Sequence, residues 1–306
     1  MDDSNQLETQ IDLHDLPDLP DGNIEQQNLL QQQIQENIPR TKYPIILLIV
    51  DYIVIVFILG FLVSLTDLGQ GIFFFVSFMT LSFAFVPILY LKFAKYDWKF
   101  ILRFSISNLS KSILLFSMLI TLNFVDSFVF FIFSIQEQKD SEENILNDSN
   151  EPVFLVWISI SLLPGICEEI FFRGFMQKVM EYNFQNIKKA ILITSLIFSF
   201  SHFDFSFFGF LYKFLLGYIF GNFASRTDSI FPSIISHILN NTMVLIFFLH
   251  ADTISISPTV SMVLFLLSLA VFILLFYFFI KKNDYIGIHF PNRNLIQRNR
   301  SEFEMN

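Results

Sequence analysis

The sequence has 306 residues, of which 53% are hydrophobic and only 15% are charged, with a mean hydropathy of +0.56. Soluble domains carry about 25% charged residues, so the composition excludes an ordinary soluble protein and indicates a polytopic membrane protein. The net charge of −9 leaves no basic footprint for nucleic acid, and no nucleic-acid partner is expected. Cys167 is the only cysteine, which excludes an internal disulfide and a cysteine-based zinc site.

The first 39 residues contain nine acidic residues and no Lys or Arg. Their polar composition favours disorder or a loose amphipathic segment. No short apolar segment follows a basic start, so a cleavable signal peptide is not expected. We interpret residues 1–42 as a polar, acidic N-terminal tail.

The rest of the chain predicts an all-α helix bundle in a membrane. A membrane-spanning helix needs about 20 apolar residues. By this measure there are about eight transmembrane helices, at 43–65, 71–91, 112–135, 153–175, 190–204, 207–225, 230–250 and 259–280. The fifth and sixth are short. The chain then divides into 43–152 (three helices and an acidic outer loop), a core at 153–250, and 251–306 (the last helix and a basic tail).

The positions of Lys and Arg predict the orientation, because cytoplasmic loops are enriched in these residues. With eight spans, basic residues before the first span and after the second, fourth, sixth and eighth all fall on one side. The loop after the second span is the most basic, with Lys92, Lys95, Lys99, Arg103 and Lys111. Both termini are therefore expected in the cytoplasm. The opposite loops are acidic, above all residues 136–151.

Three ionisable residues end the fourth apolar segment, at Glu168, Glu169 and Arg173. Ionisable groups within a membrane are costly, and they usually mark a functional site. Glu169 and Arg173 are four residues apart on a helix and can form an ion pair. Glu168 is rotated by about 100° from its neighbour and is left to face another group. Desolvation would suit Glu168 to act as a general base, although a purely structural ion network is the alternative.

Two histidines lie in later apolar segments. His202 ends the fifth, in Phe198-Ser-Phe-Ser-His202, and can be a catalyst or a packing residue. His237 and Asn241 are four residues apart in the seventh and can both donate to one oxygen, as an oxyanion hole requires. The alternative for this pair is a polar clamp between helices.

Other residues are weaker candidates. An apolar setting would make the Cys167 thiol inert. His202, His237 and a glutamate could hold zinc, since three protein ligands and a water form a catalytic zinc site, but no HExxH motif is present. Asp51 and Asp126 also lie within spans, where they could relay protons, and Asp126 could pair across helices.

The three motifs together resemble the CPBP family, which comprises CAAX proteases and bacteriocin-processing enzymes and is also called Abi. Its pattern is EExxxR, FxxxH and HxxxN, which residues 168–173, 198–202 and 237–241 match in order. Phe172-Arg173-Gly174 and residues 217–241 are also similar to the family. The resemblance covers residues 153–250.

The resemblance implies an intramembrane endopeptidase, in a family often labelled metalloprotease. Glu168 would activate water with help from His202, and His237 and Asn241 would stabilise the oxyanion. Glu169 and Arg173 would orient the site. No cofactor is expected, with zinc as the alternative. The expected partners are the lipid bilayer, that of a bacterial cytoplasmic membrane, and a membrane-anchored protein or peptide substrate.

A second hypothesis is a non-catalytic scaffold or bacteriocin-immunity protein of the same fold. The third is a small transporter, which internal inverted repeats would favour, and none is seen. The sequence specifies neither the substrate, nor recognition of a prenyl group, nor the oligomeric state.

Overall fold

A computed structural model describes residues 38–51, 72–105, 109–133, 152–249, 257–283 and 285. Every regular element among these residues is a helix, so the predicted all-α class is confirmed for them. Residues 42–51 are helical and begin the first predicted span. The remainder of that span, most of both tails and the acidic stretch 136–151 lie outside the described residues.

The helices follow the predicted apolar segments closely. In chain order they are α3 (Ile72–Phe93), α4 (Trp98–Ile101), α5 (Leu109–Phe133), α7 (Val153–Trp157), η1 (Ile158–Leu162), α8 (Leu163–Glu169), η2 (Ile170–Gln177), α9 (Lys178–Phe184), α10 (Ile187–Phe200), α11 (Phe207–Thr227), α12 (Phe231–Leu249) and α13 (Pro258–Lys282). The elements η1 and η2 are π-helical stretches within one continuous helix, which runs from α7 to α9.

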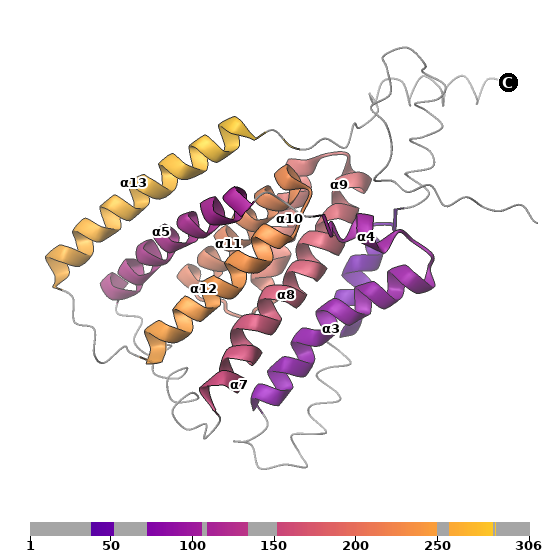
Figure 1. Ribbon diagram of the computed structural model, residues 1–306, viewed down its shortest axis with the longest axis horizontal. Coiled ribbons are helices and arrows are strands. Elements are labelled where there is room, and N and C mark those ends of the chain that lie inside the picture. The colour runs from indigo at the N-terminus through magenta and orange to yellow at the C-terminus, as the bar shows by residue number, and fades with distance from the viewer. Residues whose placement is uncertain are drawn as a thin grey trace, which may run out of the picture.

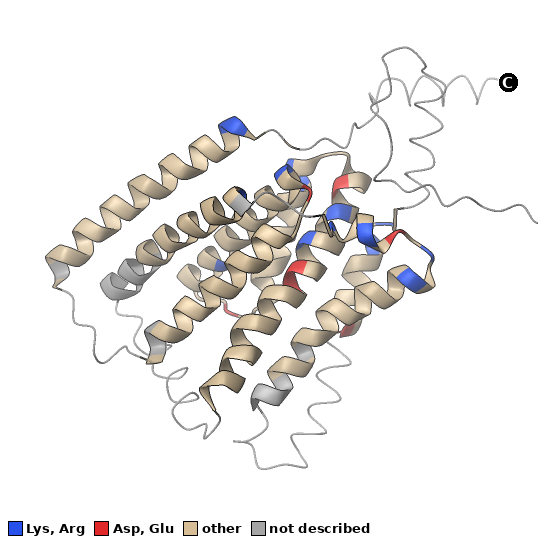
Figure 2. Ribbon diagram, in the orientation of Figure 1, with Lys and Arg blue, Asp and Glu red and all other residues tan. Residues whose placement is uncertain are grey.

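Four helical segments in the described part are long and apolar enough to cross a membrane: Val76–Phe93, Val153–Phe184, Phe207–Thr227 and Thr259–Lys282. Shorter apolar stretches are Ser110–Val125 and Phe231–Ile246. The total of eight spans and the cytoplasmic location of the termini therefore stay predictions. The basic residues do gather mainly at one end of the helices, as the positive-inside pattern requires (Figure 2).

Five helices form a row in which each packs on the next, in the order α3, α8, α12, α5 and α13 (Figure 1). Helices α10 and α11 pack mainly on each other, and both contact η2. The row places α8 between α3 and α12, and α10 reaches the same long helix through η2. The fifth and seventh predicted spans therefore both pack on the fourth, and these three spans carry the three motifs.

The long helix ends later than the sequence suggests. The predicted fourth span stops at residue 175, but the helix continues to Phe184 and includes Lys178 and Glu181. Both side chains are buried, and each has a partner of opposite charge, Asp228 for Lys178 and Arg103 for Glu181. Because these charges are paired, the helix can continue beyond the apolar run.

Helix α10 is short. Its 14 residues would span about 21 Å at 1.5 Å per residue, less than the apolar core of about 30 Å of a bilayer. A turn at 201–206 leads into α11, whose N-terminus is capped by Ser206 through the backbone N–H of Gly209. Exposed phenylalanines surround this turn, namely Phe200, Phe203, Phe205 and Phe207. Such a surface is suited to contact with lipid rather than with water.

Candidate active site

The two glutamates lie where α8 meets η2. Single π-helical turns within α-helices are frequent at functional sites, because they widen the helix and free backbone carbonyls. Gly165 lets α12 approach α8 closely, since a Cβ atom there would lie only 2.9 Å from the backbone nitrogen of Ile238. This contact brings the helix of His237 against the helix of the glutamates, and it fits the expected role of small residues in membrane helices.

Glu169, Arg173 and His237 form a buried triad. The predicted ion pair is present, with 3.1 Å between Arg173 Nη1 and Glu169 Oε1. The same carboxylate oxygen lies 3.0 Å from His237 Nδ1. The Glu169 side chain has 0% exposure, so its charge depends entirely on these two partners. If Nδ1 donates to Glu169, neutral His237 presents only a lone pair at Nε2, and donation from Nε2 requires the protonated ring.

Aromatic rings surround Arg173 and His237 of this triad. The Arg173 guanidinium lies 4.1 Å from the centre of the Phe198 ring and 5.2 Å from that of Phe220. The imidazole of His237 stacks on Phe220, with 5.2 Å between ring centres. Ring faces attract cations, most strongly where water is excluded. Phe198, the first residue of the second motif, therefore has a clear physical function, and Phe220 was not singled out from the sequence.

Glu168 faces away from this triad, as its rotation on the helix predicts, and approaches His202. Glu168 Oε2 and His202 Nε2 are 3.9 Å apart, beyond hydrogen-bond distance. His202 Nδ1 lies 2.7 Å from the carbonyl oxygen of Phe198, which can only accept, so Nδ1 carries the proton. In the neutral ring, Nε2 is then an acceptor. The exposed fractions are 15% for Glu168 and 27% for His202, so this pair is more open than the triad.

The turn after α10 holds His202 in place. Asp204 accepts hydrogen bonds from both the backbone N–H and the hydroxyl of Ser206. Asp204 also pairs with Lys213 of α11, which ties the turn to that helix. His202 itself lies just beyond the last helical residue, Phe200, and not within the span as predicted. The tightness of this turn therefore sets the depth at which His202 meets Glu168.

Asn241 has a protein partner of its own. Its Nδ2 donates to the carbonyl oxygen of Ile160 at 3.1 Å, within the π-helical stretch η1. His237 bonds with Glu169 instead, so the two side chains do not meet at one point in this structure. A shared oxyanion site for His237 and Asn241 thus stays a prediction. It requires either that Asn241 donates the second hydrogen of its amide or that its side chain rotates.

The neighbouring asparagine forms a polar clamp between helices. Asn240 is buried and accepts a hydrogen bond of 2.7 Å from Asn123 of α5. Tyr212 of α11 donates to Asn123 at 3.0 Å. Asn123 lies one turn before Asp126, whose side chain lies outside the described residues. Asp51, for which no partner was foreseen, accepts a hydrogen bond of 2.8 Å from Ser82.

Within the described ranges, no three His, Cys, Asp or Glu side chains are grouped so that they could hold a metal ion. Glu168 and His202 approach each other, while His237 is engaged by Glu169. The three-ligand zinc alternative is thus not assembled by these side chains as they stand, and we derive no step through a metal.

Comparison with known protein families supports the resemblance to CAAX proteases. The family model described as type II CAAX prenyl endopeptidase Rce1-like matches residues 150–243. Comparison with curated proteins and with solved structures finds no match. The family and the apolar helices together make the chain an integral membrane protein. The matched range contains all three motifs, and residues 150–243 of this chain are thus similar to the Rce1-like family of CAAX proteases.

Proposed function

We propose that this chain is an intramembrane endopeptidase that hydrolyses a peptide bond of a membrane-anchored protein or peptide. One observation carries the proposal: Glu168 and His202 approach within 3.9 Å and are partly exposed, whereas the adjacent Glu169 is fully buried by its partners. A base has to reach a substrate, and only the first pair is open to one.

The protonation pattern of the pair suits the activation of water. A carboxylate at Glu168 and the lone pair at His202 Nε2 are both acceptors, and they face each other. A water molecule has two hydrogens and can donate to both. Glu168 then takes one proton as the water oxygen attacks the scissile carbonyl carbon, and a tetrahedral intermediate forms. The same proton is returned to the leaving amine when the C–N bond breaks.

The negative charge that develops on the carbonyl oxygen needs stabilisation from preorganised donors. His237 and Asn241 are the proposed donors. Glu169 supports this role by holding the ring in place, since its carboxylate lies 3.0 Å from Nδ1, and donation from Nε2 requires a hydrogen at that atom. In this assignment Arg173 holds Glu169 in place and does not touch the substrate.

Purified protein in lipid vesicles tests the proposal. The substrates are a farnesylated peptide ending in a CAAX sequence, a peptide with one transmembrane helix, and a soluble peptide of the same cleaved sequence. Cleavage of either anchored peptide by the wild type, and its loss in Glu168→Gln, is expected. The two anchored peptides decide whether a prenyl group is recognised. Full cleavage by Glu168→Gln would contradict the assignment of the base.

Two further measurements define the mechanism and the alternative. We expect activity to persist in EDTA, because the proposed chemistry uses only side chains and water; loss of activity that zinc restores would favour the zinc alternative. If Glu168→Gln cells keep the full biological function, the chain acts as a scaffold or immunity protein instead.

A further inference from the structure

A short segment between α4 and α5, residues 102–105, lies against both helices that carry the buried triad. We call it the inner strap. Its first residue, Leu102, packs directly on Gly174 of η2, the residue after Arg173. A Cβ atom at Gly174 would lie 3.1 Å from both Cα and the carbonyl oxygen of Leu102. The glycine of the Phe-Arg-Gly sequence therefore allows the strap to reach the backbone of η2.

Arg103 contacts the two site helices through different atoms. Its Nη1 donates to the carbonyl oxygen of Arg173, at 3.1 Å. Its own carbonyl oxygen accepts from the backbone N–H of Ile230, at 3.3 Å, directly before α12 begins. One residue thus links η2, which carries Arg173, to the start of α12, which carries His237. The Glu169–His237 contact depends on the relative position of the same two helices.

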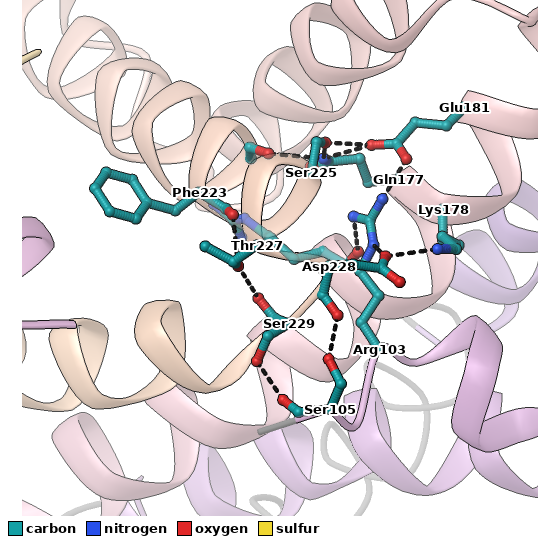
Figure 3. A network of polar contacts seen from close by, with 12 residues as sticks. Arg103, Ser105, Gln177, Lys178, Glu181, Phe223, Ser225, Thr227, Asp228 and Ser229 are labelled. Atoms are coloured by element: carbon teal, nitrogen blue, oxygen red, sulfur yellow. Dashed lines mark hydrogen bonds and ion pairs between the residues drawn. The ribbon is translucent and has the colours of Figure 1, made fainter. Parts of the chain in front are cut away.

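Arg103 and three other charged groups form one network, which holds Arg103 in this position (Figure 3). Its guanidinium pairs with Glu181 through Nη2 and with Asp228 through Nε, and Lys178 also pairs with Asp228. The set has two positive and two negative charges, so it is neutral as a whole. Burial alone would raise the pKa of Asp228, but Lys178 and Arg103 hold that pKa below its usual value. The carboxylate of Asp228 is therefore stabilised by its two cationic neighbours.

Uncharged groups complete the network. Gln177 donates to Glu181 Oε1 at 2.9 Å and to Ser225 at 2.7 Å, while Ser105 donates to the carbonyl of Asp228. The sequence had assigned Arg103 to a basic loop, as a topology signal only. In the structure its side chain is almost fully buried.

The backbone of the network is unusual at two residues that contact each other. Arg103 has φ of 55° and Asp228 has φ of 44°. Residues other than glycine rarely adopt this left-handed conformation, and they hold it only where surrounding contacts impose it. The strap and the turn before α12 are thus locked together by contacts that neither segment could provide alone.

We propose that Arg103 is a positioning residue for the active site: through the inner strap it fixes η2 relative to α12, and so sets the Glu169–His237 contact. The inference deepens the proposed protease function and rests on it for its kinetic test. Arg103 is not expected to touch the substrate, because its guanidinium is almost fully buried and already engaged by Asp228, Glu181 and the carbonyl of Arg173.

Arg226 provides a matched control. It is also a buried arginine, and it also donates to backbone carbonyls, those of Ile280 and Asn283. These carbonyls lie at the end of α13, which is not packed on the site helices. Replacement of either arginine by lysine keeps the charge and removes the planar fork. The two variants therefore differ chiefly in which helices lose a contact with the arginine: η2 and the start of α12 for Arg103, and α13 for Arg226.

The test combines kinetics with NMR of the histidine rings in the full-length protein. In Arg103→Lys we expect kcat to fall by about 100-fold, as small misplacements of reacting groups can cause, with little change in KM. The ring ¹⁵N resonance of His237 should shift, and it can be assigned among five histidines with His237→Gln. Arg226→Lys should keep kcat within about threefold and leave this resonance in place.

Glu181→Gln is the second variant, in case Arg103→Lys does not fold. It loosens Arg103 without removing it, and a smaller shift of the same resonance is expected. An unmoved His237 resonance in a folded variant, with kcat lowered no more than in Arg226→Lys, would overturn the inference. If the wild type cleaves nothing, the protease proposal fails, but the His237 resonance still decides whether Arg103 positions the site.

Discussion

Glu168 and Glu169 are neighbours in the chain, yet their surroundings are opposite. Glu169 is buried between Arg173 and His237, and aromatic rings enclose these partners. Glu168 lies 3.9 Å from His202 and is partly exposed. A fully buried carboxylate whose oxygen already contacts Arg173 and His237 is poorly placed to meet a water molecule and act as a base. The difference teaches that the rotation of about 100° between consecutive helical residues can separate a structural charge from a reactive one.

The largest effect is expected for Glu168→Gln, which removes the base and keeps the shape. General-base catalysis contributes about 100-fold to 10,000-fold, so we expect kcat to fall by about 1,000-fold. Thermal unfolding should change little, because Glu168 forms no close ion pair in the structure. The measurement is cleavage of an anchored peptide beside the melting temperature of the same preparation. A large loss of stability would show that Glu168 is also part of the framework.

Glu169→Gln, in contrast, should lower the stability of the protein strongly. It leaves Arg173 buried without its counter-charge, and breaking a buried ion pair by removing one partner costs about 3–5 kcal/mol. We expect a clear fall in the melting temperature, together with lost activity, because His237 loses its partner as well. Parallel unfolding of the Glu168→Gln and Glu169→Gln proteins in the same detergent provides the comparison. Equal melting temperatures would remove the distinction between the two carboxylates.

The sequence predicted this distinction only as far as a single helix allows. Spacing of four residues was enough for the Glu169–Arg173 pair, because that contact lies within one helix. That Glu168 meets His202, and Glu169 meets His237, depends on how helices distant in sequence pack. The spacing of four residues from His237 predicted a role for Asn241, whereas the buried hydrogen bond between helices is formed by Asn240. No local sequence pattern indicates which of the two consecutive residues, Asn240 or Asn241, forms the buried clamp.

Arg103 shows a different limit. A basic residue near the end of a membrane helix is typical of a cytoplasmic loop, and that interpretation is sufficient for most such residues. Burial of Arg103 follows from its partners Glu181 and Asp228, which come from two other segments of the chain. Sequence patterns within one segment could not identify these partners. The apolar segments themselves were predicted well, because hydropathy depends on composition alone.

A smaller effect should follow from Phe220→Leu, which tests the aromatic enclosure of the triad. Leucine keeps an apolar side chain but removes the ring face beside Arg173 and His237. Buried cation–π contacts contribute about 2 kcal/mol, so we expect a moderate fall in stability and in kcat together. Phe223→Leu is the control: Phe223 is also buried, one turn later, but it stacks on Phe279 of α13. Its kcat should stay near the wild-type value. Equal kcat in both variants would show that the ring at Phe220 is only packing.

The smallest effect is expected at Cys167, which precedes both glutamates and extends the comparison to a third residue. Its thiol is buried, so it is shielded from substrate and from reagents. A nucleophilic cysteine would have to be accessible and ionised. Cys167→Ala should therefore keep kcat within about twofold and reduce stability by about 1 kcal/mol, for the small volume that is lost. Treatment of the folded wild type with iodoacetamide should leave activity unchanged, while the unfolded chain is alkylated. Inactivation of the folded protein by alkylation of this single thiol would indicate that Cys167, and not a water activated by Glu168, is the nucleophile. The two carboxylates would then differ only as neighbours of a reactive thiol, and not as base and framework.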